Sequence, residues 1–170
     1  MIRKARLEDK DVIMSIVVGA QEYLRELDID QWQDGYPTPA SIEDDIVKGV
    51  GYVVIGEGEI VGYAAIILSG EPTYQQIADK WMYGDNYVVI HRLCASSSHR
   101  REGIAMQLMS HAATLARSEG FRAFRIDTHE GNIRMLAMLK KLCFSCAGII
   151  NYDSGKRVAY ELDLRLSKKI

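Results

Sequence analysis

The sequence lacks the features that mark membrane, secreted and nucleic-acid-binding proteins. No apolar run approaches the roughly 18 residues of a membrane-spanning helix, and the first residues contain no apolar signal core. The formal net charge is only −2, and no dense basic run is present, so nothing in the charge pattern favours a nucleic acid partner. We therefore expect a cytoplasmic protein that binds neither membrane nor nucleic acid.

Cysteine is also scarce, and its number is odd. The residues are Cys94, Cys143 and Cys146. An odd count favours a reduced chain over a disulfide framework. Cys143 and Cys146 have the C-x-x-C spacing of redox and zinc motifs, but no second ligand pair accompanies them. We interpret all three cysteines as packing residues and expect no metal.

Regular strand and helix patterns alternate along the chain, without a repeat or a linker. The length of 170 residues suits one domain, 1–170. Helices are expected over 9–27, 41–49, 103–119 and from 131 onward. Strands are expected over 2–6, 51–55, 60–68, 87–95, 121–129, 147–152 and 157–164, with 72–81 either a short helix or a loop. This order predicts a mixed α/β sheet.

Three local patterns make narrower predictions. Ser41 and Asp44 are spaced like a capping box, so a helix is expected to begin at Ser41. Gly62 lies inside a strand pattern and is typical of a bulge. One side of the strand 157–164 is apolar and is expected to be its buried face: Val158, Tyr160, Leu162 and Leu164.

The stretch from Tyr87 to Ala105 carries the most chemical information, because a strand there breaks into a polar turn that opens a helix. The N–H groups at a helix start have no intrahelical partner and attract phosphate oxygens. Gly103 permits close backbone approach, while Arg100 and Arg101 add positive charge. The turn is neither a Walker P-loop nor a dinucleotide fingerprint. It predicts an anion site, the alternative being a plain helix start.

Two motifs resemble the GNAT superfamily of N-acetyltransferases. Arg100-x-x-Gly103-x-Ala105, directly after a strand, is similar to its [Q/R]-x-x-G-x-[G/A] signature. A second block has an acidic residue on a strand, an asparagine, and a helix that ends near a phenylalanine: Asp127, Asn132 and Cys143-Phe144. The resemblance covers nearly the whole chain. It implies a GNAT-like, mostly antiparallel sheet of about six to seven strands, splayed at its centre and flanked by about four helices.

The resemblance also implies acetyl-CoA as the acetyl donor. The pantetheine arm would pair with the backbone of Leu93 to Ala95, Cys94 included, like an added strand. Asn132 would hydrogen-bond the same arm. The backbone of the turn would hold the pyrophosphate through Arg100, Arg101, Glu102, Gly103, Ile104 and Ala105.

Transfer to an amine needs a base, because only the neutral amine attacks a thioester and an alkylamine has a pKa of about 10.4. Asp127 occupies the place where some family members carry a catalytic Glu, and its shorter side chain leaves room for a water. Its structural alternative is a salt bridge with Arg125 or Arg134. His91 is the second candidate, since strand alternation places it on the face of Leu93. Its alternative is a packed, hydrogen-bonded histidine.

The clearest departure from the family pattern is Leu139. Family members often carry an acid, commonly Tyr, at the position seven residues after Asn132. Either the thiolate leaves without that acid, or another group such as Tyr152 replaces it, or activity is weak. A catalytically silent CoA-binding or sensor domain therefore stands as an alternative to the transferase, and an unrelated phosphate-ligand module as a third possibility.

The acceptor is expected to be a small-molecule or peptide amine. Trp32 and Tyr36 are large aromatics in the irregular loop 28–39, where they either line an acceptor pocket or cap the core. His129 and Glu130, at the end of the strand that carries Asp127, are further acceptor-binding candidates, with plain surface positions as the alternative. Pairing of the C-terminal strands of two chains would give a homodimer, and the composition favours neither this state nor a monomer.

Overall fold

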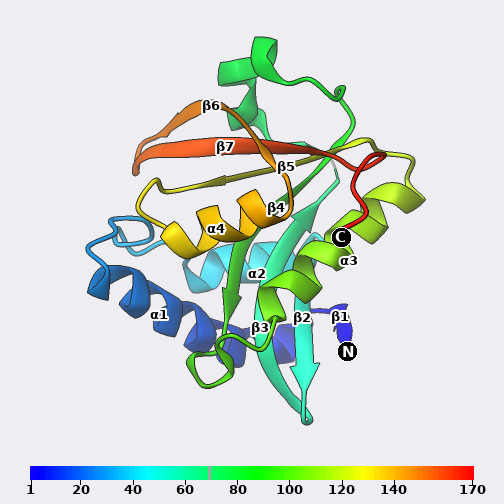
Figure 1. Ribbon diagram of the computed structural model, residues 1–170. Coiled ribbons are helices and arrows are strands. Elements are labelled where there is room, and N and C mark those ends of the chain that lie inside the picture. The colour runs from blue at the N-terminus through cyan, green and yellow to red at the C-terminus, as the bar shows by residue number, and fades with distance from the viewer. Residues whose placement is uncertain (69) are drawn as a thin grey trace. The chain divides into compact units, whose positions relative to one another are not determined.

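A computed structural model describes residues 1–68 and 70–170. The strands of this part form one seven-stranded sheet (Figure 1): β1 (Ile2–Lys4), β2 (Gly51–Gly56), β3 (Glu59–Ile67), β4 (Tyr87–Ala95), β5 (Ala123–Thr128), β6 (Ser145–Tyr152) and β7 (Gly155–Asp163). The α-helices are α1 (Lys10–Glu26), α2 (Pro39–Val47), α3 (Ile104–Ser118) and α4 (Ile133–Lys141). Short 3₁₀ helices are η1 (Leu7–Asp9), η2 (Pro72–Lys80) and η3 (Ser97–His99). The expected mixed α/β fold is confirmed.

The hydrogen-bonding order of the strands is β1-β2-β3-β4-β5-β7-β6. β4 and β5 pair in parallel, while β1–β2, β2–β3, β5–β7 and β6–β7 are antiparallel. The parallel pairing of β4 covers only Tyr87 to Val89. No helix in the described residues is long and apolar enough to cross a membrane.

The described chain divides into two compact units. Unit 1 comprises Met1–Ile66 and Ile90–His111, and unit 2 comprises Ile67–Val89 and Ala112–Ile170. β4 and α3 each begin in one unit and end in the other.

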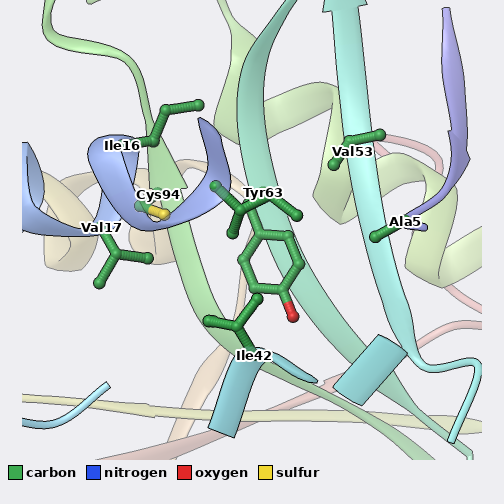
Figure 2. Close-up of a cluster of buried hydrophobic side chains, with 8 residues drawn as sticks. Ala5, Ile16, Val17, Ile42, Val53, Tyr63 and Cys94 are labelled. Atoms are coloured by element: carbon green, nitrogen blue, oxygen red, sulfur yellow. The ribbon is translucent and has the colours of Figure 1, made fainter. Parts of the chain in front are cut away.

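The core of unit 1 gathers one face of α1 and the inner faces of β2 and β3 around Tyr63 (Figure 2). Its buried members are Ala5, Ile13, Ile16, Val17, Ile42, Val53, Tyr63 and Cys94. Ile13 and Val17 are fully buried, whereas Val12 on the same helix is 47% exposed because it lies at the edge of the apolar face. Burial raises the pKa of Cys94 to about 12, so this cysteine is a packing residue, as expected.

The core of unit 2 contains a buried ion pair as well as apolar side chains. Arg125 Nε donates to Glu161 Oε1 at 3.0 Å, and both side chains are almost completely buried. The guanidinium carbon lies 3.8 Å from the ring centroid of Tyr87 and 4.3 Å from that of Trp81. Arg125 therefore pairs with Glu161, rather than with Asp127 as the structural alternative for Asp127 allowed.

The burial of β7 also differs from the sequence-based expectation. Leu162 and Leu164 are buried as expected, but Val158 and Tyr160 are only half-buried. Several residues of the opposite face are buried instead: Arg157, Ala159, Glu161 and Asp163. β7 lies between β5 and β6, and its acids are paired, Glu161 with Arg125 and Asp163 with Arg122. Paired charges can be buried, and a period-two pattern of polarity does not detect them.

The start of α2 is another correction. The helix begins at Pro39, and Thr38 forms its capping box with Ser41. The Thr38 side chain accepts from Ser41 N at 3.1 Å, while Ser41 Oγ accepts from Thr38 N at 2.9 Å. The helix therefore starts before the position that the Ser41–Asp44 pattern predicts, because proline suits the first helical position and Thr38 caps the helix in front of it.

His111 on α3 gives the stability of the protein a dependence on pH. Its ring makes an edge contact with Tyr52, with centroids 5.0 Å apart, and burial lowers its pKa. In the described residues, buried Nε2 has no hydrogen-bond partner. The unfolded chain therefore binds a proton more readily near the ordinary pKa of about 6.5.

We expect the free energy of unfolding to fall as the pH decreases through that value toward the lowered folded pKa. His111→Phe keeps a ring beside Tyr52 but cannot be protonated, so it should lose less stability than the wild type between pH 7 and 5.5. Urea unfolding at both pH values measures this, and equal losses in the two proteins would contradict it.

Candidate functional site

The turn before α3 has the backbone geometry of an anion site. Arg101 has φ 71° and Gly103 has φ 77°. Gly103 is left-handed directly before Ile104, the first helical residue of α3, and such a pair turns successive N–H groups toward a common concavity, to which α3 adds the N–H groups of its first turn. A Cβ added to Gly103 would meet no atom within 4 Å, so the space in front of this residue is open. The turn therefore fits the pyrophosphate group that the family resemblance implies.

The side chains of the turn divide into two groups. Arg100, Arg101, Glu102 and Gly103 are exposed, whereas Ile104 is buried and Ala105 is half-buried. Because the side chain of Ile104 is buried, this residue can contact a ligand only through its backbone. The guanidinium carbon of Arg100 lies 4.2 Å from the ring centroid of Tyr23 on α1, which fixes this positive charge beside the turn.

Gly62 on β3 allows the first residue of α3 to approach the sheet. A Cβ at this position would lie 2.3 Å from Ile104 Cγ2 and 3.3 Å from the carbonyl oxygen of Cys94. Gly62 pairs in register with Val54, and the irregularity in this hairpin lies between Val54 and Ile55. Because Ile55 pairs with Ile60, the register shifts directly beside Gly62, so this glycine borders the bulge expected from the sequence and is also the close-approach residue that seats α3.

A hollow borders the turn in unit 1. It is lined by the β2–β3 hairpin, the end of η3 and the start of α3, including Glu57, His99, Glu102, Ile104 and Gln107. His99 Nδ1 lies 2.9 Å from Ser98 Oγ. The hollow is lined by Glu102 and Ile104, and the space in front of Gly103 is open, so a ligand has room beside the turn.

The second half of β4 contains the residues expected to contact the pantetheine arm. Cys94 points into the core of unit 1, while Leu93 and Ala95 are half-buried. His91 is also half-buried. The alternation that buries Cys94 places Leu93 and Ala95 on the opposite face.

Arg92 interrupts this strand with a left-handed backbone, φ 54°. An L-residue in that conformation is strained by about 1–2 kcal/mol. Its side chain is held by Asp45 on α2, with Nε to Oδ2 at 2.6 Å and Nη2 to Oδ1 at 2.5 Å, and it also contacts the hydroxyl of Tyr36. Sequence reasoning missed Arg92, for which the only signal was one arginine within a largely apolar strand.

Asp127, at the end of β5, is held by two tyrosines of unit 2. Its Oδ2 accepts from Tyr74 Oη at 2.8 Å and from Tyr152 Oη at 3.0 Å. Burial, and then the charge of Asp127, raises the pKa of Tyr74 far above its ordinary value, so Tyr74 remains a proton donor. Tyr152 is half-buried. The structure thus brings Tyr152, the substitute acid considered from the sequence, into hydrogen-bonding distance of the candidate base.

Asn132 is the N-cap of α4, where its Oδ1 accepts from Met135 N at 3.2 Å. This role uses the carbonyl oxygen, and the amide of the same side chain can still donate to a ligand. His129 Nδ1 accepts from Gly131 N at 2.9 Å, while Glu130 is exposed. Leu139, in place of the family tyrosine, is fully buried in the core.

The two aromatic candidates of the loop 28–39 have different environments. Trp32 is half-buried and packs against the core cluster of unit 1, as the core-capping alternative expected. Tyr36 is 38% exposed, and its hydroxyl contacts Arg92. Within residues 1–68 and 70–170, no group of three or more His, Cys, Asp or Glu residues is arranged to hold a metal ion.

The chain is similar in sequence and structure to acetyltransferases. The acetyltransferase (GNAT) family model matches residues 21–144. A GNAT family acetyltransferase from Streptococcus agalactiae 2603 is 34% identical, with a TM-score of 0.85 over 96% of this chain and 94% of that one. No curated protein matches the sequence. The chain belongs to the acetyltransferase (GNAT) family, whose members are acyltransferases that use acetyl-CoA.

Two more distant structures share the fold. The PaiA N-acetyltransferase of Thermoplasma acidophilum, in complex with coenzyme A, is 15% identical with a TM-score of 0.70, covering 96% of this chain and 98% of that one. A ribosomal-protein-alanine N-acetyltransferase of Brucella melitensis is 16% identical with a TM-score of 0.66, covering 96% and 99%.

Proposed function

We propose that this chain, acting as one domain over 1–170, transfers the acetyl group of acetyl-CoA to the nitrogen of a small-molecule or peptide amine. The observation that carries the proposal is the open, left-handed turn between β4 and α3 in a member of this family. The coenzyme A complex of the PaiA enzyme and the name of the Brucella enzyme, a ribosomal-protein-alanine N-acetyltransferase, support the choice of donor and acceptor class. Acetyl-CoA supplies an activated thioester.

The binding residues are mainly backbone groups. The N–H groups from Arg100 to Ala105 hold the pyrophosphate, where the helix dipole favours negative charge. The backbone of Leu93 to Ala95, which lies beyond the Tyr87–Val89 stretch that pairs with β5, pairs with the pantetheine arm, and its N–H groups stabilise charge on the acetyl oxygen. The side-chain amide of Asn132 donates to the same arm.

Proton transfer is assigned to Asp127, with His91 as the second candidate base. The two phenols fix the orientation of the Asp127 carboxylate, which keeps one acceptor oxygen in a defined place. Tyr74 is a buried positioning group. Tyr152, being half-buried, carries a proton to the departing thiolate in place of the acid that is missing at Leu139.

Tyr152→Phe tests this assignment, with Tyr74→Phe as its matched control. Each removes one hydroxyl donor from Asp127 and keeps the ring. If Tyr152 carries a proton, its variant should lower kcat by about 100-fold or more, while Tyr74→Phe should cost clearly less. The readout is amine-dependent thiol release, with acetyl-CoA affinity unchanged in both. Equal kcat values for Tyr152→Phe and wild type would contradict the role.

The second candidate function is a catalytically silent CoA-binding domain. The observation that favours it is Leu139, which is fully buried and has no ionisable group. Isothermal titration calorimetry with acetyl-CoA tests what the two functions share. We expect one molecule to bind with a Kd below about 1 mM. Absence of binding would contradict both functions and favour an unrelated phosphate ligand.

A further inference from the structure

The strained residue of β4 and the loop 28–38 are joined by a polar network with a buried centre and an exposed end at Tyr36, and the proposed function assigns no role to this network. Arg92 is its centre. The Arg92 side chain is 12% exposed and that of Asp45 is 4% exposed. Asp45 Oδ2 accepts a third bond from Tyr63 Oη at 2.7 Å, in the core of unit 1. A buried charge with this many partners resists displacement.

The network reaches the loop through Tyr36. The Tyr36 hydroxyl contacts Arg92 Nη1, and the guanidinium carbon lies 5.8 Å from the Tyr36 ring centroid. The backbone of Tyr36 is held as well, because Gln21 Nε2 on α1 donates to its carbonyl oxygen at 3.0 Å. Gln33 Nε2 donates to Gln21 O at 3.0 Å, which adds a second tie between the loop and α1. Tyr36 therefore fastens the loop to β4.

The position of Arg92 within β4 links the attachment of the loop to the direction of the strand backbone. Arg92 lies directly between His91 and Leu93, and its left-handed φ sets the direction in which the backbone leaves toward Leu93 and Ala95. A change in the Arg92 conformation would turn those N–H and carbonyl groups. A ligand strand added to β4 depends on that alignment, and the loop would respond to the same change through Tyr36.

We infer that Arg92 is a positioning residue that couples the loop 28–38 to the cofactor-binding edge of β4 through Asp45 and Tyr36. The inference rests on the proposed function, because it takes acetyl-CoA or CoA as the ligand of β4. Binding of CoA orders the loop, and an ordered loop favours CoA binding, since coupling between two sites is reciprocal. Tyr36 thus contributes to acceptor binding by holding the loop in place, and it does not contact the amine itself.

Hydrogen–deuterium exchange of the full chain, with and without CoA, tests the coupling. In the wild type, saturating CoA should slow exchange of residues 28–38 by at least about threefold. Tyr36→Phe keeps the ring and loses only the hydroxyl contact. Because the coupling is reciprocal, it should bind CoA at least about threefold more weakly than wild type and lose the protection of the loop. Tyr83→Phe, in unit 2, is the matched control and should behave like wild type.

Arg92→Lys provides a second variant, because lysine keeps the charge for Asp45 but cannot form the two-point contact. It should weaken CoA binding at least about tenfold and abolish loop protection. Wild-type protection of the loop in Tyr36→Phe would overturn the inference, as would CoA binding that leaves the wild-type loop unprotected.

Hydrogen–deuterium exchange in the absence of CoA tests the attachment of the loop independently of ligand binding. Tyr36→Phe should exchange faster than wild type within 28–38, and equal rates there would overturn the tether even if CoA failed to bind. Failure of the proposed function would instead appear as the absence of a CoA binding isotherm in the wild type.

Discussion

Replacing Gly103 by Glu is expected to weaken acetyl-CoA binding by more than about 100-fold while the protein remains folded. Gly103 has φ 77° and faces open space, so a glutamate there is strained and projects its carboxylate into the region assigned to the pyrophosphate. The like charges repel, and the strain disturbs the N–H groups of the turn. Calorimetric titration with acetyl-CoA measures the effect.

Gly120 offers a matched control for this experiment. It has φ 73°, and a Cβ added there would also meet no atom within 4 Å. Gly120→Glu therefore introduces a comparable backbone strain and the same charge, but at the C-terminal end of α3. Its acetyl-CoA affinity should stay within about twofold of wild type. Tight binding by Gly103→Glu would contradict the phosphate role of the turn.

Asp127→Asn has the second large expected effect. Asparagine is nearly isosteric and still accepts hydrogen bonds from Tyr74 and Tyr152, but it cannot take a proton from an ammonium group. We expect kcat to fall by about 10²–10⁴-fold and the pH–rate profile to change, with acetyl-CoA affinity preserved. Steady-state kinetics over a range of pH provide the measurement.

Asp153→Asn is the control, because Asp153 is an exposed residue of the β6–β7 turn in the same unit. It should leave kcat and the pH–rate profile unchanged. An unchanged profile in Asp127→Asn would contradict the assignment of the base. If His91→Gln then lost activity, the base would be His91, the second candidate.

Local patterns were sufficient to predict most of the element order. The strand at Tyr87–Ala95 was predicted with its observed bounds, and Gly103 was correctly placed at the helix opening. The errors came from non-local packing. The buried face of β7 depends on Arg125, Arg122 and the flanking strands, none of which a period-two pattern contains.

In the candidate site, too, the local features could be predicted from the sequence and the long-range contacts could not. The turn at 100–105 could be predicted because a glycine, two arginines and a helix start are adjacent in the sequence. The contacts of Asp127 could not, since Tyr74 lies 53 positions away and Tyr152 lies 25 positions away. Arg92 and Asp45 are 47 positions apart, and no local pattern joins them. Hydrogen bonds and ion pairs between residues far apart in the sequence determine such contacts.

The central claim is acetyl transfer to an amine, and amine-dependent release of CoA thiol is its most direct test. Purified protein and acetyl-CoA are incubated with a panel of small amines and peptides that carry free amino groups, and free thiol is measured over time. We predict that at least one amine accelerates thiol release and is recovered in acetylated form. Calorimetric binding of acetyl-CoA with no acceleration by any amine would contradict the claim and favour a silent CoA-binding domain.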